Sequence, residues 1–441
     1  MKYRKLLPAL ALLGGALLIP SSALAAAPWS APVAVPGSQS TGDGVTDVLL
    51  TRTRGGALAY NTGGSIPGAA LTRSVLGPGL TPQAAAVWPG AVDFDSQFGS
   101  FSAADRLIYA GSNGFKRVEI ATATGPGADW KTSLRGPTTD GAFAATGAAP
   151  HGGAAAVFST FRPGGGAVYL VRQPGTQGLG PTLRLSSRGS IHSVAVAVNQ
   201  AGDVLAAWDR SGKLEARFWI NSSKHLAPVQ ELGTTDDASH LSVALGEGRS
   251  AIVAWVDQRV SEGGTAGGKV MATARSSGRG FIAPQQLDTY GVNQIAGGIA
   301  IKAAYTGGSG MGLIAFSGDT AVRAARVDGR VIGTPQDLAP VAADDTGEFG
   351  LADLATSPDS DRAVVTWVAP AGEQEQIQAA VWPEGGNAFG PVEAVSGTDR
   401  SVSRPSAAFD YKTDTIVLAW TSAQIPGGAP NEVDVVTQPA P

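Results

Sequence analysis

The sequence predicts an all-β fold in which one small antiparallel sheet is repeated along the chain, and three observations support this prediction. First, Gly accounts for 60 of the 441 residues and Pro for 28, while charged residues make up only 15%. Such a composition suits tight turns between short strands and argues against long helices. Second, an apolar strand that ends in an aromatic residue recurs along the chain. Third, the copies of this strand are regularly spaced.

The recurring strand is clearest in "VLAAW", which ends at Trp208, and in "AIVAW", which ends at Trp255. We call the aromatic residue of each copy the anchor aromatic. The anchors are Tyr109, Phe158, Trp208, Trp255, Phe316, Trp367 and Trp420, and successive anchors are 47 to 61 residues apart. A weaker copy, "DVLLT", surrounds Leu50. We expect the anchors to be buried between neighbouring sheets and not to form a platform on which sugars stack.

Each repeat contains four strand-like segments. A strand of small residues such as "SVAVAV" precedes the anchor strand, an alternating strand such as "KLEARFW" follows it, and a segment that begins with Pro comes last. The Pro-marked segments begin at Pro181, Pro228, Pro284, Pro335 and Pro391. Four short strands in sequence form an antiparallel meander, and a meander repeated about every 50 residues is the blade of a β-propeller. Pro is tolerated at an edge strand or a strand start.

The spacing predicts a single eight-bladed propeller. From Leu50 to Trp420 the repeats span 370 residues in seven intervals, and 46 of the 416 residues that follow a 25-residue leader remain for an eighth. The last repeat lacks its Pro-marked strand, whereas "APWSAPVAVPG" at residues 27–37 has that pattern and belongs to no later repeat. We therefore expect the N-terminal strand to join the last blade and close the ring. Seven blades is the alternative, if the two N-terminal repeats form one blade.

Residues 1–25 have the features of a signal peptide, and residues 26–441 form the propeller domain. A basic start, "MKYRK", precedes an apolar segment and the small-residue sequence "ALA" at residues 23–25. An uncleaved membrane anchor is the alternative. The absence of Cys excludes disulfides and a lipid anchor on cysteine. We expect a secreted protein, extracellular or in the cell envelope, that does not insert into the membrane after the signal is removed.

Charge argues against nucleic acid or an anionic membrane as the main partner. The net charge of the whole chain is −4, and loss of the leader removes three basic residues and no acidic one, which leaves −7. No block of like charge indicates a polyelectrolyte-binding stripe. The sequence does not determine the oligomeric state.

The repeat at residues 194–232 resembles the sialidase-like propeller repeats of secreted bacterial proteins. The resemblance rests on "AVAVNQAGDVLAAW" and "APVQEL" and extends roughly from Ala144 to Trp420. It implies the fold and does not imply an activity. The sialidase motif Ser-x-Asp-x-Gly-x-x-Trp is absent, and no set of three Arg residues matches the sialidase site.

The first repeat, "TGDGVTDVLLTRTRGGALAY", resembles the FG-GAP repeat, a family in which an Asp-rich loop binds calcium. Asp43 and Asp47 match the second half of that loop, but Gln39 and Thr41 occupy the positions of its first Asp and its Asn. Two carboxylates are few for Ca²⁺, which takes six to eight oxygen ligands. A turn set by Asp43 and Gly44 is the alternative. We expect no cofactor other than calcium at this loop.

Polar residues at the starts of the first strands are the candidate site. His192 in "GSIHSV" and His240 in "ASHLSV" occupy similar positions in adjacent repeats. The other members that we expect near the channel mouth are Arg404, Asn293, Gln294 and Glu348. Such a ring suits an acidic sugar, or catalysis with His192 and His240 as bases. Acidic pairs such as Asp236 and Asp237 lie in predicted turns and are interpreted as turn-forming residues.

Three functions fit these observations. The first is a non-enzymatic propeller that binds glycan or cell-surface material on one face of the ring. The second is a carbohydrate-active enzyme, a polysaccharide lyase or glycoside hydrolase, that uses the channel-mouth His and Arg residues. The third is a passive scaffold for protein interactions. We favour the first, because no Gly-x-Ser-x-Gly elbow or His-x-x-x-His metal motif accompanies the histidines.

Overall fold

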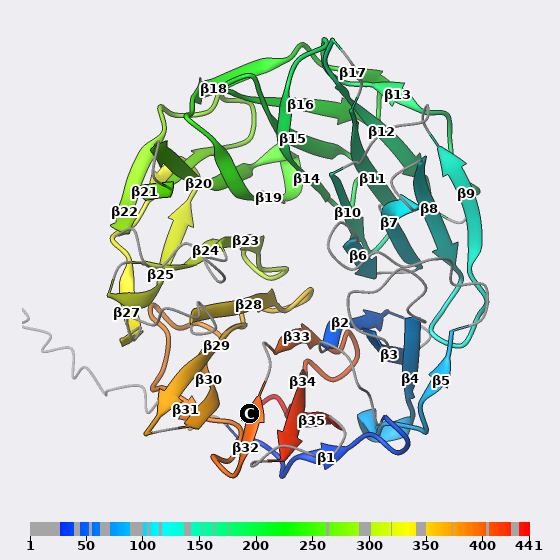
Figure 1. The fold of residues 1–441 in the computed structure, drawn as a ribbon, viewed down its shortest axis with the longest axis vertical. Helices are drawn as coiled ribbons and strands as arrows, with labels where there is room; N and C mark the ends of the chain where they lie inside the picture. The colour runs from blue at the N-terminus through cyan, green and yellow to red at the C-terminus, as the bar shows by residue number, and fades with distance from the viewer. Residues whose placement is uncertain are drawn as a thin grey trace, which may run out of the picture.

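The computed structural model describes residues 27–38, 45–52, 55–61, 71–88, 100–103, 106–113, 117–135, 143–151, 153–161, 164–175, 177–261, 264–290, 301–318, 320–340, 350–372, 374–402, 405–424 and 432–441. Eight antiparallel sheets form a ring, which confirms the eight-bladed propeller (Figure 1). In the first seven blades the first strand lies nearest the centre of the ring, and later strands lie further out (Figure 1). In the last blade the segment Ser406–Phe409 takes this inner place. Residues 1–25, the predicted signal peptide, lie outside the described residues.

The first four blades follow one another along the chain. Blade 1 contains β2 (Val45–Thr51), β3 (Gly55–Asn61), β4 (Leu71–Leu76) and β5 (Ala86–Val87). Blade 2 contains β6 (Ser100–Ala103), β7 (Leu107–Asn113), β8 (Arg117–Ala123) and β9 (Lys131–Arg135). Blade 3 contains β10 (Ala144–Ala149), β11 (Gly153–Thr160), β12 (Ala167–Gln173) and β13 (Leu183–Arg184). Blade 4 contains β14 (Ile191–Val198), β15 (Val204–Arg210), β16 (Lys213–Ile220), β17 (His225–Leu226) and β18 (Gln230–Thr234).

The remaining blades complete the ring. Blade 5 contains β19 (Ala238–Leu245), β20 (Ala251–Ser261), β21 (Gly264–Arg275) and β22 (Gln285–Tyr290). Blade 6 contains β23 (Ile301–Tyr305), β24 (Gly312–Ser317), β25 (Ala321–Asp328), β26 (Val331–Ile332) and β27 (Gln336–Pro340). Blade 7 contains β28 (Gly350–Thr356), β29 (Ala363–Ala371), β30 (Gln374–Trp382) and β31 (Glu393–Ala394). Blade 8 contains β32 (Arg400–Val402), β33 (Ser406–Phe409), β34 (Ile416–Gln424), β35 (Glu432–Gln438) and β1 (Val33–Ala34). Two short 3₁₀ helices are described, η1 (Pro78–Leu80) and η2 (Glu247–Arg249).

The anchor aromatics pack between blades, as the sequence predicts. Each lies on the second strand of its blade and joins a hydrophobic cluster shared with the preceding blade. Trp208, for example, packs with blade 3 residues and Trp255 with blade 4 residues, and both are almost fully buried. Burying such a ring removes a large apolar area from water and stabilises the interface. The core is therefore a set of layers between adjacent sheets.

The first repeat departs from the prediction. The segment around Leu50 belongs to β2, which is the innermost strand of blade 1, and not to a second strand. The second strand is β3, and Tyr60 on this strand lies 49 residues before Tyr109. The count of eight blades is unaffected, because the repeat still supplies one complete sheet.

Small and hydroxyl residues line the innermost strands because neighbouring blades approach closely there. A side chain at Gly147 in β10 would lie 3.0 Å from the carbonyl oxygen of Val196 in β14. Hydroxyl groups also bond across the gap between blades: Ser193 Oγ donates to the carbonyl oxygen of Ala238 at 2.6 Å, and Ser242 Oγ accepts from the amide of Ala303 at 3.0 Å. These bonds satisfy backbone groups that lie at the inner edge of each sheet.

The two ends of the chain close the ring, as predicted. β1 pairs antiparallel with β35, with Val33 opposite Val435. The amide of Val35 donates to the carbonyl of Val433 at 2.8 Å. The cluster between blades 8 and 1 contains Val35 and Leu50 but, among the described residues, no aromatic side chain. Aliphatic packing and backbone pairing thus replace the anchor at this interface.

Ring closure is tested with two neighbouring valines. Val35 is buried and Val33 is 47% exposed. Val35→Ala should lower the free energy of unfolding by about 1–2 kcal/mol, because two buried methyl groups are lost and a cavity remains. Val33→Ala is the control and should change it by about 0.5 kcal/mol or less. Urea unfolding of both variants measures the difference, and equal effects would show that residue 35 does not help to seal the ring.

Candidate functional site

The candidate residues that the structure describes lie on one face of the ring. We call it the strand-start face: it is the end at which innermost strands begin and second strands finish. His192 is the second residue of β14 and His240 the third residue of β19, and both are exposed. Each lies at a break in strand register, between Ile191 and Ser193 in β14 and between Ser239 and Ser242 in β19. The backbone φ of His240 is +45°, in the left-handed region.

The imidazole ring of His192 lies near two carboxylates, one from its own blade and one from the next blade. Its Nδ1 lies 3.3 Å from Oδ1 of Asp237, which immediately precedes β19 in blade 5. Its Nε2 lies 2.9 Å from Oγ of Ser190. Asp209, at the end of β15, completes the group, and one donor atom from each of His192, Asp209 and Asp237 lies within 4.8 Å of the others. The group spans the junction of blades 4 and 5.

Asp209 is the buried member of this group. Its side chain is fully buried, and its Oδ2 accepts a hydrogen bond from the amide of Ala238 at 3.0 Å. Burial raises the pKa of Asp209 above its ordinary value, and the nearby Asp237 carboxylate acts in the same direction. The bond from Ala238 and the charge of His192 oppose this increase. Holding a charged carboxylate at this blade junction therefore costs electrostatic free energy.

The sequence did not identify the partners of His192. Asp237 was interpreted as a turn-forming residue, and Asp209 was not singled out. The available signal was position: Asp209 directly follows the anchor Trp208, so it ends a second strand on the same face on which β14 begins. Of the remaining predicted site residues, Arg404, Asn293, Gln294, Glu348 and Asp43 lie outside the described residues. Asp47 lies in β2, opposite Ala59, and nothing is described of its side chain.

A polar pocket of about 300 Å³ opens on the same face, in blade 8. The pocket is lined by Pro32, Ala34, Ser396, Gly397, Asp399, Arg400, Val402, Trp420, Ser422, Glu432 and Asp434. Its walls therefore come from the N-terminal segment, from β32 and the loop before it, and from the facing ends of β34 and β35. We call it the blade-8 pocket.

One guanidinium and three carboxylates set the charge of the blade-8 pocket. Arg400 Nη1 donates to Oε2 of Glu432 at 2.7 Å and to Oγ of Ser422 at 3.0 Å. Ser422 Oγ in turn donates to Oδ2 of Asp434 at 2.5 Å. The ionised set of Asp399, Glu432, Asp434 and Arg400 carries a net charge of −2. Burial raises the pKa of Asp434, with further contributions from Glu432 and Asp399.

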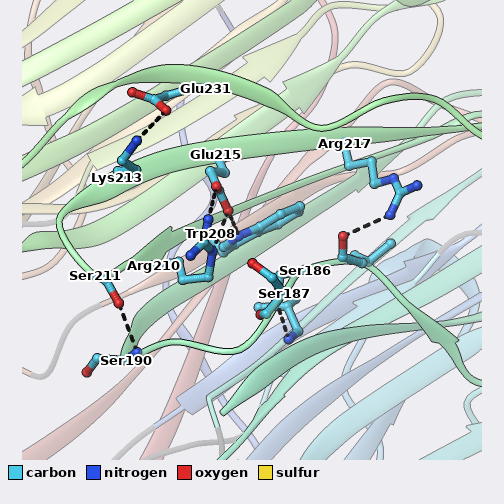
Figure 2. Close-up of polar contacts among 12 residues, drawn as sticks. Ser186, Ser187, Ser190, Trp208, Arg210, Ser211, Lys213, Glu215, Arg217 and Glu231 are labelled. Carbon is cyan, nitrogen blue, oxygen red and sulfur yellow. Dashed lines mark hydrogen bonds and ion pairs between the residues drawn. The ribbon is translucent and has the colours of Figure 1, made fainter. Parts of the chain in front are cut away.

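In two other blades the residue opposite the anchor aromatic also carries a charge, and nearby groups of opposite charge pair with it. In blade 4, Glu215 lies opposite the anchor Trp208, as Asp434 lies opposite Trp420 in blade 8. Figure 2 shows Glu215 bonded to both Trp208 and Arg210: it accepts from Trp208 Nε1 at 2.7 Å and from Arg210 Nε at 2.9 Å. In blade 6, Arg323 takes this position.

The partners of Arg323 complete the comparison. Arg323 forms ion pairs with Asp337, at 2.6 Å, and with Asp288. The charge at this register position is therefore paired with opposite charge in blades 4 and 6, in blade 6 partly by the exposed carboxylate of Asp337. In blade 8 Arg400 pairs with Glu432, and Asp399 and Asp434 add two further carboxylates to the pocket. The blade-8 pocket thus retains an excess of negative charge, part of it on the buried Asp434.

Two other hollows have different characters. One, of about 280 Å³, lies among the innermost strands and is lined largely by small residues, together with the ion pair of Lys302 and Asp353 at 3.6 Å. The other, of about 530 Å³, lies between blades 8 and 1 at the opposite face and is lined mostly by Gly, Thr and Pro, with Asp410 and Lys412 at its edge. Neither His192 nor His240 lines these hollows or the blade-8 pocket.

Comparison with known proteins identifies fold similarity. No protein-family model matches the chain, and no curated protein sequence does so. The structure of the Dos1 propeller is 13% identical, with a TM-score of 0.49, over 93% of this chain and 95% of that one. The six-bladed lectin of Aleuria aurantia is 12% identical, with a TM-score of 0.35, over 68% and 95% of the two chains. The Hadza microbial sialidase Hz136 is 9% identical, with a TM-score of 0.36, over 76% and 73%. These similarities carry no information about ligand or activity.

Within the described part of the chain, we find no helix with the length and apolar character that crossing a bilayer requires.

The buried charge network of blade 4 is tested against the exposed ion pair between Lys213 in β16 and Glu231 in β18. Glu215→Ala should lower the free energy of unfolding by about 2–3 kcal/mol, because Arg210 and the indole N–H of Trp208 lose a partner in a buried site. Lys213→Ala, which breaks the exposed pair with Glu231 (Figure 2), should cost about 0.5 kcal/mol or less. Chemical unfolding measures both. Similar losses in the two variants would contradict this account of blade 4.

The raised pKa of Asp434 predicts a pH-dependent effect. A carboxyl whose pKa is higher in the folded state stabilises the fold at low pH, and this contribution is lost as pH rises through the folded-state pKa. Asp434→Asn keeps an oxygen acceptor for Ser422 but carries no charge. The variant should therefore gain stability relative to the natural protein as pH rises above the ordinary Asp pKa of about 3.9, measured by urea unfolding. Asp328→Asn, at a carboxyl 83% exposed, is the control and should show no such trend.

Proposed function

We propose that this chain is a secreted, non-enzymatic propeller that binds a glycan in the blade-8 pocket on the strand-start face. The observation that carries this proposal is the concentration of charged and hydroxyl side chains in the lining of one hollow. The pocket offers three carboxylates, one guanidinium and two hydroxyls beside the buried Trp420. Carboxylates accept hydrogen bonds from pairs of sugar hydroxyls, and a small number of convergent polar groups is typical of ligand pockets.

The charge of the pocket defines the class of glycan. A net charge of −2 repels uronates and sialic acids and attracts sugars that carry an amino group. We therefore propose neutral or amino-bearing glycans as ligands. This differs from the acidic sugar suggested by the sequence, where His192, His240 and Arg404 were considered together without Asp399, Glu432 or Asp434.

A carbohydrate-active enzyme is the second candidate, and one observation favours it. His192 lies between the carboxylate of Asp237 and the hydroxyl of Ser190, an arrangement in which an imidazole is oriented as a general base. Against this function, His192 is exposed and lines none of the described hollows, so no substrate-sized pocket adjoins it among them. A passive interaction scaffold would need neither the blade-8 pocket nor the arrangement around His192.

Glycan binding is tested on an array that includes neutral, amino-bearing and acidic glycans, with and without EDTA. We expect binding to neutral or amino-bearing glycans and a loss of about tenfold or more in affinity for Asp399→Asn, which removes one exposed carboxylate from the pocket. Asp328→Asn, an equal change of charge outside the pocket, should bind as the natural protein does. Retained affinity in Asp399→Asn, or binding confined to acidic glycans, would contradict the proposed site.

The enzymatic candidate is tested in parallel. Absorbance at 235 nm on uronate polymers detects lyase activity, and release of reducing sugar detects hydrolysis. We expect neither. Activity that is lost in His192→Ala but kept in Asp399→Asn would establish the enzyme and overturn the non-enzymatic proposal. Absence of both binding and activity would favour the scaffold.

A further inference from the structure

The group formed by His192, Asp209 and Asp237 is separate from the blade-8 pocket and is not used by the proposed glycan site. It joins three elements: His192 comes from β14, Asp209 from the end of β15, and Asp237 from the segment before β19. Two blades therefore contribute to it. A ligand held by these three side chains would connect blade 4 to blade 5 at the strand-start face.

The separations within the group suit a shared ion. The donor atoms lie within 4.8 Å of one another, and His192 Nδ1 is 3.3 Å from Asp237 Oδ1. An N–H···O hydrogen bond is usually about 2.9–3.0 Å long. Two ligands in a tetrahedral site, each about 2.0–2.2 Å from the metal, are separated by about 3.3–3.6 Å. The observed distance matches the second case better than the first.

Asp209 supplies an independent observation. The side chain is fully buried and Oδ2 accepts from Ala238, and the backbone of Gly212 also acts on the carboxylate, but no group among the described residues meets Oδ1 in hydrogen-bond geometry. A buried carboxylate oxygen left without a partner is costly, and buried charges in proteins are paired or coordinate metals. The carboxylate lies within 4.8 Å of a ring nitrogen of His192 and of a carboxylate oxygen of Asp237. A cation placed among the three side chains would supply the missing partner.

Ser190 provides the supporting contact that a metal-bound histidine requires. If Nδ1 faces the carboxylates, the other ring nitrogen, Nε2, carries the proton and donates to Ser190 Oγ at 2.9 Å. Such a bond fixes the tautomer and the orientation of the ring, and it is characteristic of histidine ligands in metal sites. Ser190 is itself held, because its amide donates to Ser211 Oγ at 3.1 Å (Figure 2).

We propose that His192, Asp209 and Asp237 bind one first-row divalent transition metal ion, of which Zn²⁺ is the probe of choice. One imidazole and two carboxylates suit Zn²⁺ or Mn²⁺, whereas Ca²⁺ takes six to eight oxygen ligands and does not use imidazole. The two carboxylates balance the charge of the ion. Three protein ligands leave at least one coordination position for water or an exogenous ligand at the exposed side of His192.

The test uses the full chain without a polyhistidine tag, freed of metal with EDTA and titrated with Zn²⁺ by calorimetry. We expect one ion per chain, and a rise in the midpoint of thermal unfolding on adding the ion. His192→Ala and Asp237→Asn should each lower the affinity at least about tenfold. Both residues are solvent-accessible, so these variants avoid the folding defect that removal of Asp209 invites.

Two nearby residues provide matched controls. His225 in blade 4 is exposed and bonds to Ser223 Oγ at 2.7 Å, and Asp236 is exposed beside Asp237. His225→Ala and Asp236→Asn should bind Zn²⁺ as the natural protein does. The proposal is overturned if no stoichiometric Zn²⁺ binds, if His192→Ala binds it unchanged, or if the control variants lose as much affinity. Loss of Zn²⁺ binding with intact glycan binding in His192→Ala separates this site from the blade-8 pocket.

Discussion

No blade of this propeller has an interior of its own, and this constraint governs the rest of the structure. Each sheet is one layer thick, so its apolar side chains are buried only against the sheets on either side. A blade at the end of an open row would expose one apolar face and one strand edge. The ring removes both exposed faces at once, and it does so in a chain that has no cysteine to link its ends. Pairing of β1 with β35 is therefore a condition for the burial achieved everywhere else.

The same constraint explains why the fold could be predicted from the sequence. An interface repeated around a ring needs a similar large side chain at the same position of each repeat. Aromatic residues such as Trp208, Trp255 and Trp420 therefore recur at nearly regular spacing. The first repeat was misassigned because the segment around Leu50 has the apolar character of a second strand, although it forms the innermost strand β2. Among the described residues, the cluster between blades 8 and 1 is aliphatic and includes Val35 and Leu50. Ring closure was predictable because the last repeat lacks its Pro-marked strand. The chain also begins with a strand of that pattern that belongs to no later repeat.

The candidate site was predictable only in part. The alternating pattern places His192 and His240 at the starts of their strands, but it does not reveal the breaks in register that accompany them. Those breaks decide where each side chain points, and the partner of His192 comes from the neighbouring blade. The blade-8 pocket was missed for a related reason. Arg400, Ser422 and Asp434 converge through the pairing of β32, β34 and β35, which a linear reading of single repeats does not connect.

The pairing of the first strand with the last has a consequence for the order of folding. The partners Val33 and Val435 are separated by about 400 residues, so the first strand to be synthesised waits for the last. Until then the outer edge of β35 is open, and an open strand edge is a template for another chain. The β1 segment of a second molecule can fill that edge with the same backbone bonds. Exchange of this segment between copies is thus the characteristic misassembly of a ring sealed in this way.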